Sequence, residues 1–126
     1  MNTALWIVTA LLAAAFFFGG AGKIALAKDR IHAFGASAHW VEDFSERGVK
    51  GIGAVEVLAA FGLILPAVTD IAPVLVPVAA VGIMLLMTGA AVVRLRRGEL
   101  KFMIADVVYF LLAAFVAWGR FGPEAF

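Results

Sequence analysis

The sequence contains no cysteine, which excludes disulfide bonds, thiol catalysis and cysteine-ligated iron–sulfur clusters in this chain. Charged residues make up 15% of the chain and the net charge is +1, so the composition gives no case for nucleic-acid binding. No glycine-rich loop follows a strand, and the fingerprint of a nucleotide-binding site is therefore missing.

Histidine is also scarce: His32 and His39 are the only two in the chain. Both lie in a polar stretch, so a haem held between membrane helices is not expected. His39 and Asp43 are four residues apart and could offer two metal ligands on one helical face. Two ligands do not make a site, and we predict no metal.

What the sequence has in abundance is apolar residues, at 64% of the chain with a mean hydropathy of +1.04, where a soluble domain is nearer half apolar. Four continuous runs are long enough to cross a bilayer as helices. We predict an all-α integral membrane four-helix bundle, one domain over 1–126, with helices at about 4–22, 49–68, 73–93 and 102–119. The stretch before the first run lacks the basic residues of a signal peptide, so this run is expected to be a retained helix.

Lysine and arginine are distributed unequally between the two ends of these runs. Nine of the ten lie in the connections 23–50 and 94–101, and only Arg120 lies at the other end. Basic connections stay on the cytoplasmic side. We therefore predict that both basic connections are inside and both termini outside, in a plasma membrane.

The longer basic connection carries an apolar stripe. Apolar residues recur at spacings of three and four, at Ile31, Phe34, Ala38 and Val41, which is typical of an amphipathic helix. We predict one short helix on the membrane surface, from about Asp29 to Phe44. Gly35 would weaken it.

Two carboxylates interrupt the apolar runs, Glu56 in the second and Asp106 in the fourth. With ~1.5 Å of rise per residue, each lies roughly 8–9 Å from the basic end of its helix. Basic side chains at that end can reach the same layer, namely Lys23, Lys50, Arg94 and Lys101. We predict that Glu56 faces the bundle interior and contacts Lys23.

The helix faces support this arrangement. Small residues surround Glu56 at helical spacing and give a narrow side that other helices can approach: Gly53, Ala59 and Ala60. Tyr109 follows Asp106 by three residues, so its hydroxyl could donate to a carboxylate or a ligand. Bulky residues are expected to face lipid, namely Leu63, Leu65, Phe110 and Leu111. The candidate site is thus Lys23, Glu56, Asp106, Tyr109 and Arg94.

Several motifs together resemble the DoxX-like family of small four-helix bacterial membrane proteins. They are "AGKIALAK" at 21–28, "WVEDFS" at 40–45, "VKGIGAVEVLAAFGLILP" at 49–66 and "RLRRGE" at 94–99. The family's recurrent lysine falls on Lys23, its glutamate on Glu56 and its Arg-x-Gly-Glu-like turn on positions 96–99. Asp106 stands where the family often has asparagine, which adds a charge. The family takes its name from a small subunit associated with quinone-linked oxidation.

Three functions remain open. The first is an accessory or anchoring subunit of a redox assembly that uses quinone. The second is a binder or carrier of a small lipophilic molecule or lipid in an intramembrane pocket near Glu56. The third is a structural membrane module whose charged residues only hold the helices together. Nothing in the sequence supplies an electron carrier, so an independent enzyme is not expected. Small-residue pairs, Ala15 with Gly19 and Ala113 with Ala117, could serve contacts within the bundle or between copies in a homo-oligomer.

Overall fold

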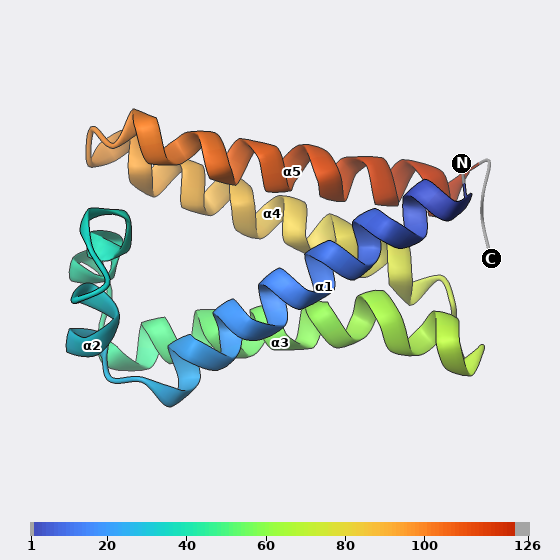
Figure 1. Ribbon diagram of the computed structural model, residues 1–126, viewed down its shortest axis with the longest axis horizontal. Coiled ribbons are helices and arrows are strands. Elements are labelled where there is room, and N and C mark those ends of the chain that lie inside the picture. Colours follow the sequence, from blue (N-terminus) through green and yellow to red (C-terminus); the bar gives the residue numbers. More distant parts are fainter. Residues whose placement is uncertain (1, 123–126) are drawn as a thin grey trace.

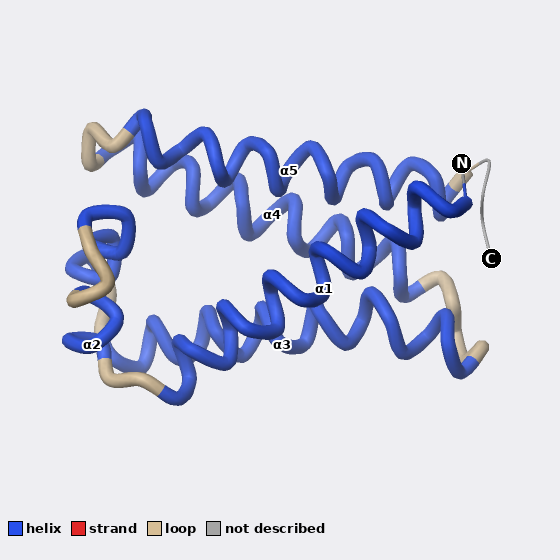
Figure 2. Tube along the Cα trace, in the orientation of Figure 1, coloured by secondary structure: helices blue, strands red, loops and turns tan. Residues whose placement is uncertain are grey.

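The computed structural model describes residues 2–122. Over this range the chain is helical throughout, with short turns and no strand (Figure 2). The elements follow in the order α1 (Asn2–Ala25), α2 (Lys28–His32), the 3-10 helix η1 (Ala36–Asp43), α3 (Glu46–Thr69), α4 (Leu75–Arg96) and α5 (Leu100–Phe121).

Four of these helices, α1, α3, α4 and α5, are long and apolar enough to span a membrane. They have 22 to 24 residues, which at ~1.5 Å per residue exceeds the ~30 Å of a hydrocarbon core. Their ends differ from the predicted runs by up to three residues. The prediction of an all-α membrane bundle is confirmed.

The spans form two antiparallel pairs, α1 with α3 and α4 with α5 (Figure 1). The first pair crosses where Gly20 faces Gly53. A Cβ atom on Gly53 would lie 2.6 Å from the carbonyl oxygen of Gly20, and one on Gly20 would lie 2.5 Å from that of Gly53. Since real Cβ atoms do not approach oxygen so closely, this backbone contact needs glycine on both helices. The prediction that Gly53 marks the narrow face of its helix is confirmed.

The second pair is joined by a tight turn. Gly98 has φ = 72°, in the left-handed region that glycine adopts without strain. The amide of Glu99 donates to the carbonyl of Arg94 at 2.8 Å, and that of Gly98 donates to Leu95 at 3.2 Å. This is the Schellman pattern of a helix end, and it turns α5 back along α4.

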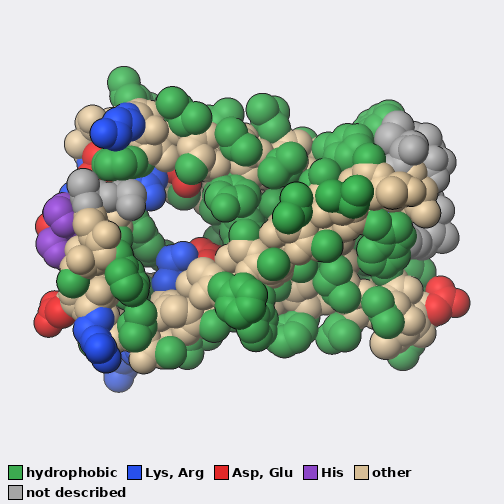
Figure 3. Space-filling model, in the orientation of Figure 1, with side chains coloured by type: hydrophobic (Ala, Val, Ile, Leu, Met, Phe, Trp, Pro, Cys, Tyr) green, Lys and Arg blue, Asp and Glu red, His purple; other side chains and the backbone are tan. Residues whose placement is uncertain are grey.

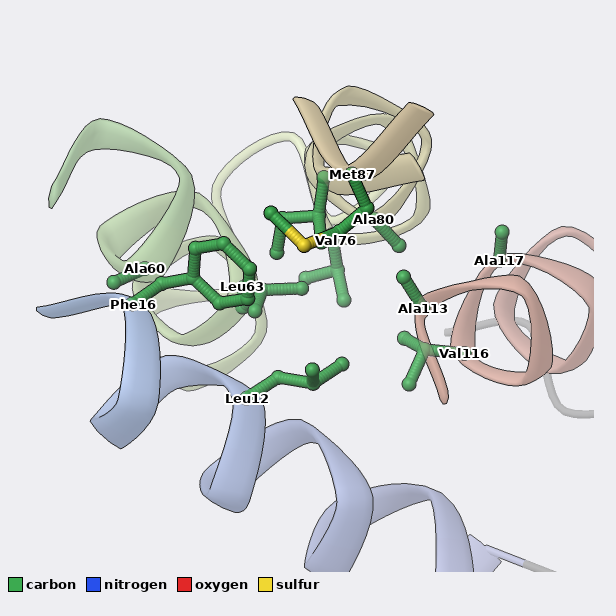
Figure 4. Close-up of a cluster of buried hydrophobic side chains, with 11 residues drawn as sticks. Leu12, Phe16, Ala60, Leu63, Val76, Ala80, Met87, Ala113, Val116 and Ala117 are labelled. Carbon is green, nitrogen blue, oxygen red and sulfur yellow. The ribbon is translucent and has the colours of Figure 1, made fainter. Parts of the chain in front are cut away.

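The pairs meet in an apolar core toward the α3–α4 connection (Figure 4). All four spans contribute buried side chains: Leu12, Phe16, Ala60, Leu63, Val76, Ala80, Ile83, Met87, Ala113, Val116 and Ala117. Ala113 and Ala117 thus serve contacts within the bundle. Their small side chains let α5 pack closely against its neighbours.

Leu63 corrects a prediction. It was expected to face lipid because it is bulky, but it is fully buried. Leu63 follows Glu56 by seven residues, which is two helical turns, so both side chains lie on the same face of α3. Leu65 and Leu111 are exposed as predicted, and Phe110 is half-buried.

The connection from α1 to α3 folds into a cap, which we define as α2 together with η1. It lies across the end of the bundle that carries most of the Lys and Arg residues, at the left in Figure 1; we call this the basic end. Ile31 and Val41 are buried there against Val49, whereas Phe34 is 73% exposed. The prediction of one continuous helix is wrong, because Gly35, at φ = 128°, reverses the chain between two short helices.

Candidate functional site

A cavity of about 650 Å³ separates the two helix pairs near the basic end. Figure 3 shows an opening on this face of the molecule, with basic and acidic side chains on both of its sides. Its walls come from all four spans and the cap: Lys23, Trp40, Phe44, Ile52, Val55, Glu56, Gly82, Leu85, Leu86, Met87, Gly89, Ala90, Val93, Arg94 and Asp106. Four of these residues are charged, and most of the others are apolar.

One side of the cavity carries the ion pair of Lys23 and Glu56. The Lys23 Nζ atom donates to both carboxylate oxygens, at 2.9 and 3.0 Å. Glu56 is only 6% exposed, so an unpaired charge there would be costly. The Nζ atom also lies 5.5 Å from the centre of the Trp40 ring, within cation–π range. The predicted contact between Glu56 and Lys23 is confirmed.

The helix crossing explains why these two side chains meet. Lys23 follows Gly20 by three residues, and Glu56 follows Gly53 by three residues. Residues three apart share a helix face. Because α1 and α3 are antiparallel, the two side chains start on opposite sides of the crossing: a Cβ atom on Gly53 would lie 2.8 Å from Lys23 Cβ, and one on Gly20 would lie 3.0 Å from Glu56 Cβ. The long lysine side chain spans the remaining distance, so its Nζ atom reaches the carboxylate.

The other side of the cavity carries the pair of Arg94 and Asp106. The Arg94 Nε atom lies 3.1 Å from Asp106 Oδ2, and its Nη1 atom lies 3.5 Å from Glu99 Oε1. Both carboxylates come from α5 or its N-terminal cap, while Arg94 is in the last turn of α4. The α4–α5 turn thus aligns a second buried pair at the same end of the molecule as the first.

Three residues that we predicted to be at this charged layer lie elsewhere. Tyr109 is absent from the cavity wall and packs edge-on against Phe16, with 5.6 Å between ring centres. Three residues turn a helix by about 300°, which points Tyr109 into the apolar core. Lys50 donates to the Ile24 carbonyl at 2.7 Å and so caps α1. Lys101 extends over the Phe102 ring at 5.4 Å.

Two wall residues were not predicted from the sequence: Trp40 in the cap and Phe44, which directly follows η1. Their rings are perpendicular, with 5.6 Å between centres. The sequence signal that could have predicted this pair is the spacing of four residues between two aromatic residues in an otherwise polar connection. The glycines Gly82 and Gly89 were also missed; nothing lies within 4 Å of where their Cβ atoms would be, so they widen the cavity on the α4 side.

Arg97 fastens the cap to the α4–α5 turn. Its guanidinium lies 2.8 Å from Glu42 and 3.1 Å from Asp43, both on η1, and 3.2 Å from Glu99. Hydrogen bonds from Arg97 and then His32 lower the pKa of Glu42 to about 2. A depressed pKa means that this contact favours the folded state above the ordinary pKa of a glutamate and is lost only as the pH falls toward 2.

These residues give the cavity a definite chemistry. Its apolar walls suit a hydrocarbon group, while the ammonium of Lys23 and the guanidinium of Arg94 are hydrogen-bond donors. The carboxylates of Glu56 and Asp106 are acceptors. Charged groups within membrane spans are costly and are functional candidates by default; here they flank a space large enough for a ligand.

The fold and this site define a multi-pass membrane protein whose four-helix bundle holds a charged intramembrane cavity. A model of the DoxX-like family matches residues 7–116. The chain belongs to the DoxX-like family. No curated protein and no solved structure matches it.

Proposed function

We propose that this protein binds a small lipophilic molecule with a polar, hydrogen-bonding head, of the quinone class, in the cavity beside Glu56. The observation that carries the proposal is the cavity itself. Two buried ion pairs border an opening of about 650 Å³ within the membrane-spanning part of the bundle.

The size and lining of the cavity support a ligand with a hydrocarbon part. Ligand pockets commonly measure about 300–1,000 Å³ and are lined mainly by apolar side chains with a few polar groups. Helix α4 contributes more wall residues than any other element, among them the aliphatic Leu85, Leu86 and Val93. A hydrophobic tail in the cavity would give these side chains the packing contacts that they lack when the cavity is empty.

The charged groups support a head with two oxygen atoms. A quinone carbonyl accepts hydrogen bonds, which Lys23 and Arg94 can donate from opposite sides of the cavity. A quinol hydroxyl donates, and the Glu56 and Asp106 carboxylates can accept. The same four side chains therefore suit both oxidation states of such a head group.

We further propose that the chain works as an accessory subunit of a quinone-linked redox system in the bacterial plasma membrane. Without cysteine, it has no thiol redox chemistry of its own. A partner subunit would supply the electron carrier, and this chain would supply the quinone site.

Quenching of tryptophan fluorescence tests the binding step. With Trp6 and Trp118 replaced by phenylalanine, Trp40 reports from the cavity wall. A short-tailed quinone such as decylubiquinone should quench it saturably in detergent or nanodiscs. Gly82→Leu should place a bulky side chain in part of the cavity and weaken the binding at least ~10-fold, or ~1.4 kcal/mol.

Gly51→Leu is the matched control, since Gly51 is exposed, lies outside the cavity wall and has no neighbour within 4 Å of its Cβ position. It should leave the affinity within about twofold, well under 1 kcal/mol. A protein with Trp118 as its single tryptophan measures non-specific quenching. Equal quenching of Trp40 and Trp118, or an unchanged affinity in Gly82→Leu, would refute binding in the cavity.

The orientation that we propose has the basic end inside and both termini outside, following the positions of Lys and Arg. The cysteine-free chain allows a direct test with single cysteines at exposed positions. In intact cells an impermeant maleimide should label Thr3→Cys and Ile71→Cys but not Ala33→Cys or Leu100→Cys. Labelling of the last two without permeabilisation would reverse the orientation.

A further inference from the structure

The two histidines of the chain meet face to face on the cap. The rings of His32 and His39 are stacked, with 4.0 Å between centres and 6° between planes. Glu42 joins them, with its Oε2 atom 2.6 Å from His32 Nε2. One ligand atom from each of the three residues lies within 4.8 Å of the other two.

Local geometry explains this meeting. Residues three apart eclipse one another in a 3-10 helix, so His39 and Glu42 lie on the same side of η1. His32 ends α2, and the chain reversal at Gly35, with φ = 128°, brings it opposite them. A turn that only glycine adopts readily thus brings three metal-ligating groups together.

We propose that His32, His39 and Glu42 form a binding site for a divalent cation of the zinc type. Two imidazoles and one carboxylate are an established zinc donor set that leaves a fourth position for water. Tetrahedral bonds of ~2.0–2.1 Å put ligand atoms ~3.3 Å apart. The ligand atoms lie up to 4.8 Å apart, so the stacked rings would have to turn to reach that spacing, and their partial exposure leaves room for this.

The charges around the site are compatible with a cation. The groups that face Glu42 are His32, Arg97 and, next along η1, Asp43. Arg97 contacts Glu42 through Oε1, while Oε2 contacts His32; an ion would replace this hydrogen bond between His32 and Glu42 and bind both groups. Glu42 would then bridge the ion and the α4–α5 turn, so metal binding would fasten the cap to the second helix pair. The site is separate from the cavity ligand, and its test needs no quinone.

The experiment is a titration of the purified, tag-free protein with Zn²⁺ alone, by calorimetry or competition with a chromophoric chelator. One Zn²⁺ should bind per chain. His32→Asn, His39→Asn and Glu42→Gln should each weaken the binding at least ~10-fold, in line with loss of one ligand. Asp29→Asn is the control, an exposed carboxylate of the same cap outside the cluster, and should leave the affinity unchanged.

A second measurement tests whether metal binding holds the cap to the α4–α5 turn. Zn²⁺ should slow proteolysis of the α2–η1 segment in the wild type and in Asp29→Asn, but not in His39→Asn. Both histidine variants alter exposed or half-exposed side chains, and retained helicity will show that they fold. Absence of stoichiometric binding in the wild type, or binding that both histidine variants retain, would overturn the site.

Discussion

Replacing Gly53 with alanine should destabilise the bundle, although alanine favours a helix. The added methyl group would lie 2.6 Å from the Gly20 carbonyl oxygen and 2.8 Å from Lys23 Cβ. Neither neighbour can move without separating α1 from α3. Overpacking of this kind costs about 1–3 kcal/mol, more than the ~0.5–1 kcal/mol that alanine gains over glycine within a helix. Denaturation in mild detergent measures the difference.

Gly51→Ala supplies the matched control, since the same change two residues earlier on α3 meets no neighbour within 4 Å. It should be neutral or stabilising by up to ~1 kcal/mol. Gly20→Ala should resemble Gly53→Ala, because its methyl group would lie 2.5 Å from the Gly53 carbonyl oxygen. If Gly53→Ala proved as stable as Gly51→Ala, the close crossing of α1 and α3 would be refuted.

Breaking the pair of Glu56 and Lys23 should have a comparable effect. Glu56→Gln leaves the Lys23 ammonium without its counter-charge in a largely buried position. Removal of one partner of a buried pair typically costs ~3 kcal/mol. The same cost is expected for Lys23→Met, and the double variant should lose less than the sum of the two single changes.

Thermal or chemical unfolding of the four proteins completes this double-mutant cycle. Lys101→Met is the control partner, since Lys101 is exposed and lies over Phe102; combined with Glu56→Gln it should be additive. Additivity between Glu56 and Lys23 would contradict the pairing. A Glu56→Gln protein that folds normally and loses quinone quenching would assign the carboxylate to the ligand instead.

The sequence predicted the features that depend on regular helix geometry. Each of the four apolar runs is long enough to cross a bilayer as a helix. A single span must satisfy its own backbone hydrogen bonds within the bilayer, so each run is expected to be a helix. The depth of Glu56 and the small residues around it were enough to predict its contact with Lys23. The bulk of Leu63 suggested a lipid-facing residue, whereas its seven-residue spacing from Glu56 places it on the buried face of α3.

The sequence offered an intramembrane pocket near Glu56 only as one of three alternatives, because the presence and size of the cavity depend on how far apart the two helix pairs lie. That distance is set jointly by the core, the turn at Gly98 and the cap, and no local pattern encodes it. The same holds for the cap. A helical stripe predicted one straight helix, but the φ angle of Gly35 reverses the chain, which brings Trp40 to the cavity and His39 beside His32.

The helix pairs touch in the core near the α3–α4 connection and part toward the basic end, as Figure 1 shows. At that end the cap lies across the space between the two pairs (Figure 1). Lateral pressure in the membrane would press the two helix pairs together there, and a ligand in the cavity would oppose this. Under the proposed function, binding of the lipophilic molecule would therefore respond to the lateral pressure in the leaflet around the basic end.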